Sequence, residues 1–148
     1  MEIRELSSDE FNEAFCLSRS VFQEFEAPDY SEEGIKTFSN SLNDPSYIAM
    51  LKIYGAFDNK QLVGILATRS KGDHIALFFV NGRYHRRGIG RKLFKKACLD
   101  NMSRKITVNS SPYAKEIYHH LGFTDTDTEQ LTDGLRYIPM ICILDQKC

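Results

Sequence analysis

The amino-acid sequence predicts an α+β fold, in which a mostly antiparallel sheet of six to seven strands carries about four helices on its two faces. Strand-like runs follow one another at residues 47–58, 61–69 and 74–80, with only short turns between them. A basic amphipathic helix then starts near Gly88, and further short strands follow it. Strands joined by short turns pair antiparallel, and a helix that follows them packs on the sheet.

The first 45 residues are expected to form one strand and two helices. Residues 1–6 are predicted as the strand. Ser7-Ser8-Asp9-Glu10 is typical of a capping box, which satisfies free amides at a helix start, and this helix should fade over residues 25–28. A second helix should start at Ser31 and stop near Asn43-Asp44-Pro45, because the residue before a proline disfavours the helical conformation.

The middle of the chain supplies the central strands. Asp58-Asn59-Lys60 is a plausible hairpin turn after the first of them, and Lys71-Gly72-Asp73 is expected to form the next turn. His74 to Val80 is a short run rich in Ile, Leu, Phe and Val, which favours a buried strand. The amphipathic helix that follows should end near residues 101–103.

Three strands and one more helix are expected beyond that point. Residues 105–109 are predicted as a strand. Ser110-Ser111-Pro112 should start a helix, since proline is tolerated in the first turn, and Gly122 should end it in a left-handed conformation. The last two strands and the polar loop between them are expected at residues 124–127, 135–144 and 128–134.

Length and composition favour one soluble domain over residues 1–148. The chain has 148 residues, of which 42% are hydrophobic and 26% are charged, and this is ordinary for a globular protein. No apolar run approaches the roughly 20 residues that span a bilayer, and the polar N-terminus is unlike a signal peptide. The 4 cysteines are scattered without a CxxC pair, which is typical of a reducing compartment. We therefore expect a cytoplasmic protein without a membrane partner.

The turn before the basic helix predicts a binding site for phosphate groups. Glycines at 88 and 90 stand where the first amides of a helix lack partners, so an anion can reach the backbone there. Seven Lys or Arg and no acid lie between Arg83 and Lys96, so the rest of the chain, whose total net charge is −1, carries −8. Such a compact basic patch favours one ligand with several phosphates over a nucleic acid.

Two motifs identify this ligand more closely. The turn lacks the GxxxxGK[ST] of a P-loop, and Leu93 stands where a dinucleotide fingerprint needs its third glycine. Instead, His85-Arg86-Arg87-Gly88-Ile89-Gly90 resembles the [QR]xxGx[GA] signature of the GNAT superfamily of acetyl-CoA-dependent N-acetyltransferases, with His85 in place of Gln or Arg. Residues 109–123 resemble the second motif of that superfamily, in which Asn, Ala, Tyr and Gly-Phe recur in this order. The resemblance extends over residues 1–145.

The resemblance implies a mixed, twisted sheet that splays open between its fourth and fifth strands, with acetyl-CoA in the gap. Amides of the turn would hold the pyrophosphate, and the pantetheine arm would pair with the exposed strand edge like an added strand. Asn109 would form a hydrogen bond with the pantetheine arm. The cofactor-binding residues so implied are Phe78, Phe79, Val80, His85, Arg86, Arg87, Gly88, Ile89, Gly90, Arg91 and Asn109.

The implied reaction is direct transfer of an acetyl group to a primary amine in a ternary complex. Tyr118 matches the family tyrosine that protonates the CoA thiolate as general acid, while the N–H of Val80 would polarise the acetyl carbonyl. His74 occupies the place where some members carry a glutamate base, and an imidazole can relay a proton. Three acids are alternatives to His74 for binding or deprotonating the amine, and these are Glu24, Glu26 and Asp29.

Several alternatives stay open at the level of the sequence. Tyr118 would also suit a core position, and His74 would also suit a half-exposed strand start. The alternative to an enzyme is a non-catalytic acyl-CoA-binding or sensor domain on the same fold. The first 44 residues carry eleven acids and three bases, a pattern of solvated helices that also suits a cationic small-molecule or peptide amine.

No metal and no nucleic-acid partner is expected. His119 and His120 are adjacent, so on a helix their side chains point about 100° apart, and no acid or cysteine is spaced to complete a site with them. The basic stretch lacks the interleaved exposed aromatic residues of a nucleic-acid surface. The last strands of such folds often pair between subunits, which leaves a homodimer open.

Overall fold

The computed structural model describes residues 1–144 and confirms the α+β prediction with an eight-stranded, mostly antiparallel sheet. The strands run in the order β1-β2-β3-β4-β5-β8-β6, with β7 paired to β8, and only β4 and β5 pair in parallel. Their bounds are β1 (Glu2–Glu5), β2 (Lys52–Asp58), β3 (Gln61–Arg69), β4 (His74–Val80), β5 (Lys105–Ser110), β6 (Thr124–Asp125), β7 (Gln130–Thr132) and β8 (Leu135–Ile143).

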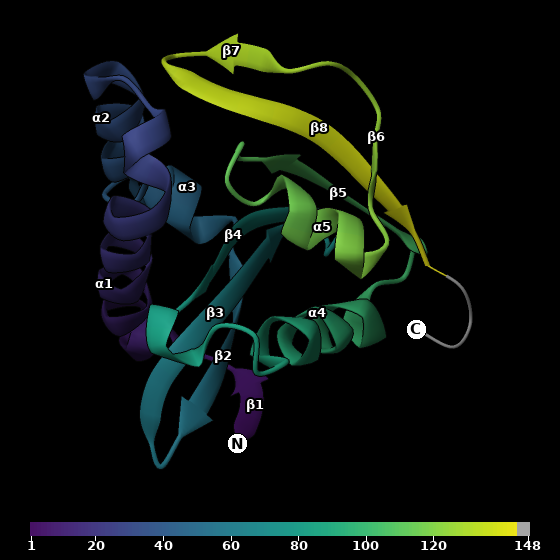
Figure 1. Ribbon diagram of the computed structural model, residues 1–148. Helices are drawn as coiled ribbons and strands as arrows, with labels where there is room; N and C mark the ends of the chain where they lie inside the picture. Colours follow the sequence, from purple (N-terminus) through teal and green to yellow (C-terminus); the bar gives the residue numbers. More distant parts are fainter. Residues whose placement is uncertain (145–148) are drawn as a thin grey trace.

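Helices cover both faces of this sheet, with α1 and α2 on one side and α4 and α5 on the other (Figure 1). A π-helical turn, Phe22–Glu26, continues α1, and a 3₁₀ turn, Ala27–Asp29, follows it. The helices are α1 (Phe11–Val21), α2 (Glu32–Ser41), α3 (Pro45–Ala49), α4 (Ile89–Asp100) and α5 (Lys115–Leu121).

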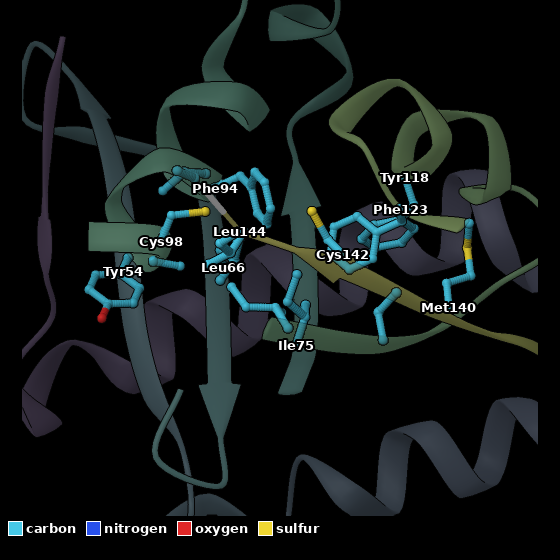
Figure 2. Close-up of a cluster of buried hydrophobic side chains, with 14 of the residues drawn as sticks. Tyr54, Leu66, Ile75, Phe94, Cys98, Tyr118, Phe123, Met140, Cys142 and Leu144 are labelled. Carbon is cyan, nitrogen blue, oxygen red and sulfur yellow. The ribbon is translucent and has the colours of Figure 1, made fainter. Parts of the chain in front are cut away.

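Each face of the sheet has its own hydrophobic core. The core under α4 and α5 contains the apolar face predicted for the basic helix, including Leu93. Figure 2 shows Phe94 of this face together with Tyr118 and Phe123. The core under α1 and α2 is built on Phe15 and Phe22 of the first helical segment, among others. Burying apolar surface on both faces holds the sheet rigid between two helical layers, and rigid elements position the site.

The strands and turns of the middle of the chain lie where the sequence places them. The bounds of β3 and β4 match the predicted residues 61–69 and 74–80. Asn59 and Lys60 both adopt positive φ (50° and 70°), as a two-residue hairpin turn requires. The basic helix ends at Asp100, one residue before the predicted end.

The predicted strand at residues 47–58 is wrong in its first part. Residues 45–49 form the short helix α3, and β2 begins only at Lys52. The physical reason is a helix start in the sequence: Pro45 occupies the first turn, and the Asp44 carboxylate accepts a hydrogen bond of 3.0 Å from the Ser46 N–H.

Two smaller predictions for the C-terminal third are also corrected. The segment expected as a loop, residues 128–134, contains β7, which pairs with the start of β8 across a turn at Asp133 and Gly134. The last helix starts at Lys115 rather than at Pro112. The Ser111 hydroxyl accepts a hydrogen bond of 3.2 Å from the Ala114 N–H, which holds residues 112–114 as a turn ahead of the helix.

The sheet splays between β4 and β5, as expected. These strands are in register only at His74 opposite Thr107 and Ile75 opposite Val108. Beyond this point β5 stays paired with β8 as far as Ser110, while β4 stays paired with β3 as far as Val80. The second half of β4 therefore has one edge without a neighbouring strand.

The contact between α2 and the β7–β8 turn predicts a measurable loss of stability. A Cβ on Gly34 would overlap the Gly134 carbonyl oxygen, which cannot move freely because it belongs to the backbone. We expect Gly34→Ala to cost about 1–3 kcal/mol through overpacking, and so to lower the Tm by about 2–12 °C. Calorimetry should show this loss, whereas Lys36→Ala on the exposed side of α2 should change the free energy of unfolding by less than about 0.5 kcal/mol. Equal melting of both variants would contradict the contact.

Candidate functional site

The N-terminus of α4 presents unpaired amides to solvent. Gly88 caps the helix in a left-handed conformation (φ 79°), and the Lys92 N–H donates to its carbonyl oxygen over 3.1 Å. The amides of residues 89–91 precede that bond and have no carbonyl within the helix. A Cβ at Gly88 would meet nothing within 4 Å, so an anion can approach this turn without obstruction, whereas Gly90 lies close to the ring of Phe78.

Positive charge around this turn is not neutralised by the protein. None of the seven bases between Arg83 and Lys96 lies within ion-pair distance of a carboxylate among residues 1–144. Arg86 and Arg87 are exposed, and the Arg87 guanidinium lies over the Tyr84 ring at 5.2 Å. Arg91 donates to the His120 carbonyl oxygen of α5 over 3.4 Å. Unpaired amides and free bases together make an anion site.

His85 uses its side chain to hold the turn rather than to face solvent. Its Nε2 lies 2.6 Å from the Val80 carbonyl oxygen, and because a carbonyl only accepts, Nε2 carries the proton. The imidazole also packs against the ring of Phe25, with centroids 4.8 Å apart. The His85 side chain therefore links the turn to the end of β4. The backbone amides of the turn, rather than this side chain, are available to a ligand.

The free edge of β4 offers backbone groups at alternate residues. The Asn81 N–H donates to the Val63 carbonyl oxygen over 2.8 Å, so Val80 faces Gly64 as a non-hydrogen-bonded pair. The N–H of Val80 and, two residues earlier, both backbone groups of Phe78 then point away from β3, into the gap left by β5. The backbone N–H and C=O of Phe79 point towards β3 and pair with it. An extended ligand arm can pair with Phe78 and Val80 as an added strand would.

Two cavities meet at the splay of the sheet. The first, which we name the α4 cleft, has a volume of about 590 Å³ and extends from the α4 turn to α5. The second, the α2 cleft, has a volume of about 360 Å³ and lies between β4, α2 and the start of β8. Both are lined by the same five residues at their junction, which are Glu26, Phe78, Phe79, Ala114 and Tyr118. Groups at this junction can act on two molecules bound side by side.

Tyr118 reaches the junction from a buried position on α5. The residue is 5% exposed, and its ring packs edge-on against Phe78 and Phe123 with centroid distances of 5.9 and 5.3 Å. Its hydroxyl has no hydrogen-bond partner among the 144 described residues. Burial raises the pKa of this phenol well above its ordinary value, and the charge of Glu26 raises it further. The hydroxyl therefore stays protonated at neutral pH.

Of the three acids predicted in the loop after the first helix, only Glu26 lines the clefts. It lies at the end of the π-helical turn, a feature often found at functional sites. Burial raises the pKa of its carboxyl to about 7, the charge of Asp29 adds to this rise, and the nearby Ser111 hydroxyl opposes it. Glu24 and Asp29 are exposed and line neither cleft. The protonation of the Glu26 carboxyl therefore changes near neutral pH.

His74 and Asn109 lie on the α2 cleft only. His74 Nδ1 is 2.8 Å from the Thr107 hydroxyl oxygen, at the end where β4 and β5 still pair. Burial and the charge of Arg69 lower the pKa of this imidazole to about 4. Its Cα lies four residues along β4 from Phe78, or roughly 13 Å at the usual rise per residue. The structure therefore keeps His74 apart from Tyr118, while Asn109 is an exposed residue of β5.

Several polar wall residues had no signal in the sequence. Tyr30, Arg69, Ser111 and Arg136 line the α2 cleft, but each stands in an ordinary strand or turn of the chain. Only the fold brings them together. Among residues 1–144, no group of three His, Cys, Asp or Glu is placed to hold a metal ion, and none of the helices there is long and apolar enough to cross a membrane.

Comparisons with known proteins agree with this geometry. A sequence model described as an acetyltransferase (GNAT) domain matches residues 26–144. A GCN5-related N-acetyltransferase structure from Rhodopseudomonas palustris is 20% identical and covers 97% of this chain and 95% of its own, with a TM-score of 0.81. The PaiA N-acetyltransferase of Thermoplasma acidophilum, solved in complex with coenzyme A, is 20% identical with a TM-score of 0.69, covering 96% and 98%.

Further solved structures share the fold at similar identity. An acetyltransferase of the GNAT family from Staphylococcus aureus is 18% identical, covers 97% of this chain and 99% of its own, and has a TM-score of 0.68. A search of curated protein sequences gives no match. At such identities the solved structures establish the fold, while the sequence model covers most of the chain.

Proposed function

The chain belongs to the GNAT acetyltransferase family and is an acyltransferase, and from this premise we propose that it moves an acetyl group from acetyl-CoA to a primary amine of a small molecule or peptide. The observation that carries the proposal is the junction of two clefts at Glu26 and Tyr118. One cleft begins at an anion site, and the other opens beside it. A donor and an acceptor bound in these clefts would meet at one acid and one base, which is the arrangement that direct transfer requires.

The α4 cleft suits coenzyme A. The amides of residues 89–91 and the surrounding bases fit a pyrophosphate, and the open space over Gly88 admits it. The backbone groups of Phe78 and Val80 would hold the pantetheine arm along β4. The residues on the cleft wall lead from the turn to Tyr118, so the reactive end of the donor would lie at the junction. When bound, acetyl-CoA supplies the activated acetyl thioester.

Three groups of this chain would then act on the reaction. The Val80 N–H, which points into the gap, would stabilise negative charge that develops on a carbonyl oxygen. Tyr118 would hold a proton at its hydroxyl for a leaving thiolate, because its raised pKa keeps the phenol protonated. Glu26 would take the proton from the attacking amine.

We place the base role on Glu26 rather than on His74. A base works best when its pKa lies near the working pH, and the pKa of Glu26 is raised to about 7. The imidazole of His74, with a pKa lowered to about 4, is a weak base and lines only the α2 cleft. Its hydrogen bond to Thr107 fits a role in holding β4 and β5 together at the closed end of the splay.

The turn glycine provides a test of the donor site. Gly88→Ala should disfavour the left-handed turn and move the amides of residues 89–91, and losing one charge-assisted hydrogen bond would raise the Kd for CoA by about tenfold or more. Gly72→Ala is the matched control, since Gly72 also has a positive φ (86°) and its Cβ would meet nothing nearer than 4.0 Å. Calorimetric titration with CoA should separate the two. Equal affinities in both variants would contradict the turn as the phosphate site.

The activity itself is tested by an amine screen. The purified protein is mixed with acetyl-CoA and a panel of amino acids, polyamines, amino sugars and peptides, and free thiol is measured over time. We expect thiol release that depends on the amine, with the acetylated amine found by mass spectrometry. A protein that binds acetyl-CoA and releases no thiol with any amine would instead be an acyl-CoA-binding or sensor domain.

A further inference from the structure

The α2 cleft contains a cation without a counter-charge. Arg69, the last residue of β3, lines this cleft, and no carboxylate among residues 1–144 lies within ion-pair distance of its guanidinium. Its side chain is half-buried. Its charge acts on the side chains of Tyr47 and His74. Burial and this charge together lower the pKa of His74. Burial raises the pKa of Tyr47, and the charge of Arg69 opposes that rise. A half-buried guanidinium without a protein counter-charge can still pair with an anionic ligand.

The second cation of the α2 cleft, Arg136, already has partners within the protein. The Arg136 guanidinium is paired with the Glu129 carboxylate at 3.0 Å, and it also donates to the Asp29 carbonyl oxygen over 3.2 Å. His74 is neutral at pH 7, because its pKa is lowered to about 4. Arg69 is therefore the charged donor of the cleft that remains for a ligand.

Tyr47 adds a hydroxyl beside this guanidinium. It lines the same cleft, and its hydroxyl has no hydrogen-bond partner among residues 1–144. A guanidinium that offers parallel N–H groups, with a phenol next to it, matches the oxygen atoms of a carboxylate. The acidic residues of the N-terminal half do not oppose such an anion here, since Glu26 is the one acid of the first 44 residues that lines either cleft.

The distance between Arg69 and the junction sets the length of the ligand. Arg69 is in register with His74, and Phe78 at the junction lies four residues further along β4, or roughly 13 Å between Cα atoms. The reach of the arginine side chain shortens this gap but does not close it. A molecule that spans it carries its anion several bonds away from its amine, farther than in an α-amino acid.

We infer that the acceptor is an amine with a carboxylate several bonds away, held by Arg69 and Tyr47 at one end of the α2 cleft and by Glu26 at the other. This inference rests on the proposed acetyl transfer and narrows its acceptor. It departs from the cationic amine that the acidic N-terminal half suggests. The cleft selects for an ω-amino acid or a short peptide-like acid rather than for a diamine.

A matched series of amines tests the inference. Straight-chain ω-amino carboxylates, alkylamines of the same length and the corresponding diamines are compared as acceptors, over three to eight methylenes, by thiol release. We expect the best carboxylate to exceed its alkylamine about 10- to 100-fold in kcat/KM, as a charge-assisted hydrogen-bonded pair would give. Arg69→Met should abolish this preference, and Arg69→Lys should keep part of it, because lysine retains the charge without the planar fork.

The control is Lys71→Met, which removes a base that borders a neighbouring cavity with Arg69 but does not line the α2 cleft. It should leave the preference unchanged, and all variants should keep the wild-type Kd for acetyl-CoA if they are folded. Alkylamines or diamines that serve as well as the carboxylates would overturn the inference while leaving acetyl transfer intact. An equal loss for carboxylates and alkylamines in Arg69→Met would overturn it too. Absence of thiol release with every amine would overturn both proposals.

Discussion

Glu26→Gln is expected to lower kcat for amine acetylation by about 10²–10⁴-fold, which is the usual contribution of a general base. The amide of glutamine has nearly the same shape as the carboxyl but cannot accept a proton from an ammonium. Glu26 lies at the junction rather than at the α4 turn, so we expect the Kd for acetyl-CoA to change little. Glu24→Gln is the matched control, because Glu24 is exposed two residues away and lines neither cleft. Steady-state kinetics at saturating acetyl-CoA measures the difference.

The pH dependence of activity also tests the role of Glu26 as the base. A base acts in its ionised form, and the pKa of the Glu26 carboxyl is raised to about 7, so activity should rise with pH through about 7. The residual activity of Glu26→Gln should lack this step, whereas the control variant should keep it. If the step persists in Glu26→Gln, or if the variant turns over like wild type, the proton is taken by another group and the base assignment is wrong.

Tyr118→Phe has the second large expected effect, a fall in kcat of about 10²–10⁴-fold through the loss of a general acid. Phenylalanine keeps the ring that packs between Phe78 and Phe123, and the hydroxyl has no partner to lose among residues 1–144. Stability and acetyl-CoA affinity should therefore stay near wild type. Tyr113→Phe is the control, because Tyr113 lines the α4 cleft at its exposed side. Unchanged turnover of Tyr118→Phe at saturating substrates would rule out the acid role.

The fold was predictable wherever local patterns decide the structure. Strand-like runs marked β3 and β4, the turns at residues 58–60 and 71–73 marked where each begins, and glycine with helical apolar spacing marked α4. The error at residues 45–49 has a local signal after all, since Asp44-Pro45 is a helix start as well as a helix stop. The strand β7 carries no such signal, because it is three residues long and depends on its pairing with β8.

The residues proposed for the donor side could be named from the sequence, and those proposed for the acceptor side much less so. The proposed donor site consists of backbone amides and glycines, which belong to one contiguous motif. The acceptor side is built from separate segments. The sequence offered three acids in one loop, and only the π-helical turn decides that Glu26 enters the junction. Arg69 lies at the end of an ordinary strand, and only the packing of α2 and β8 around β4 forms the cleft that it lines.

We propose that the unpaired amides at the start of α4 and on the free edge of β4 hold the CoA group. The most direct measurement is an NMR titration of ¹⁵N-labelled protein with CoA, which reports each amide separately. We predict the largest shifts at Ile89, Gly90 and Arg91 and at Phe78 and Val80, with saturation at one CoA per chain. Shifts confined to the exposed basic face of α4, with these five amides unmoved, would contradict the account.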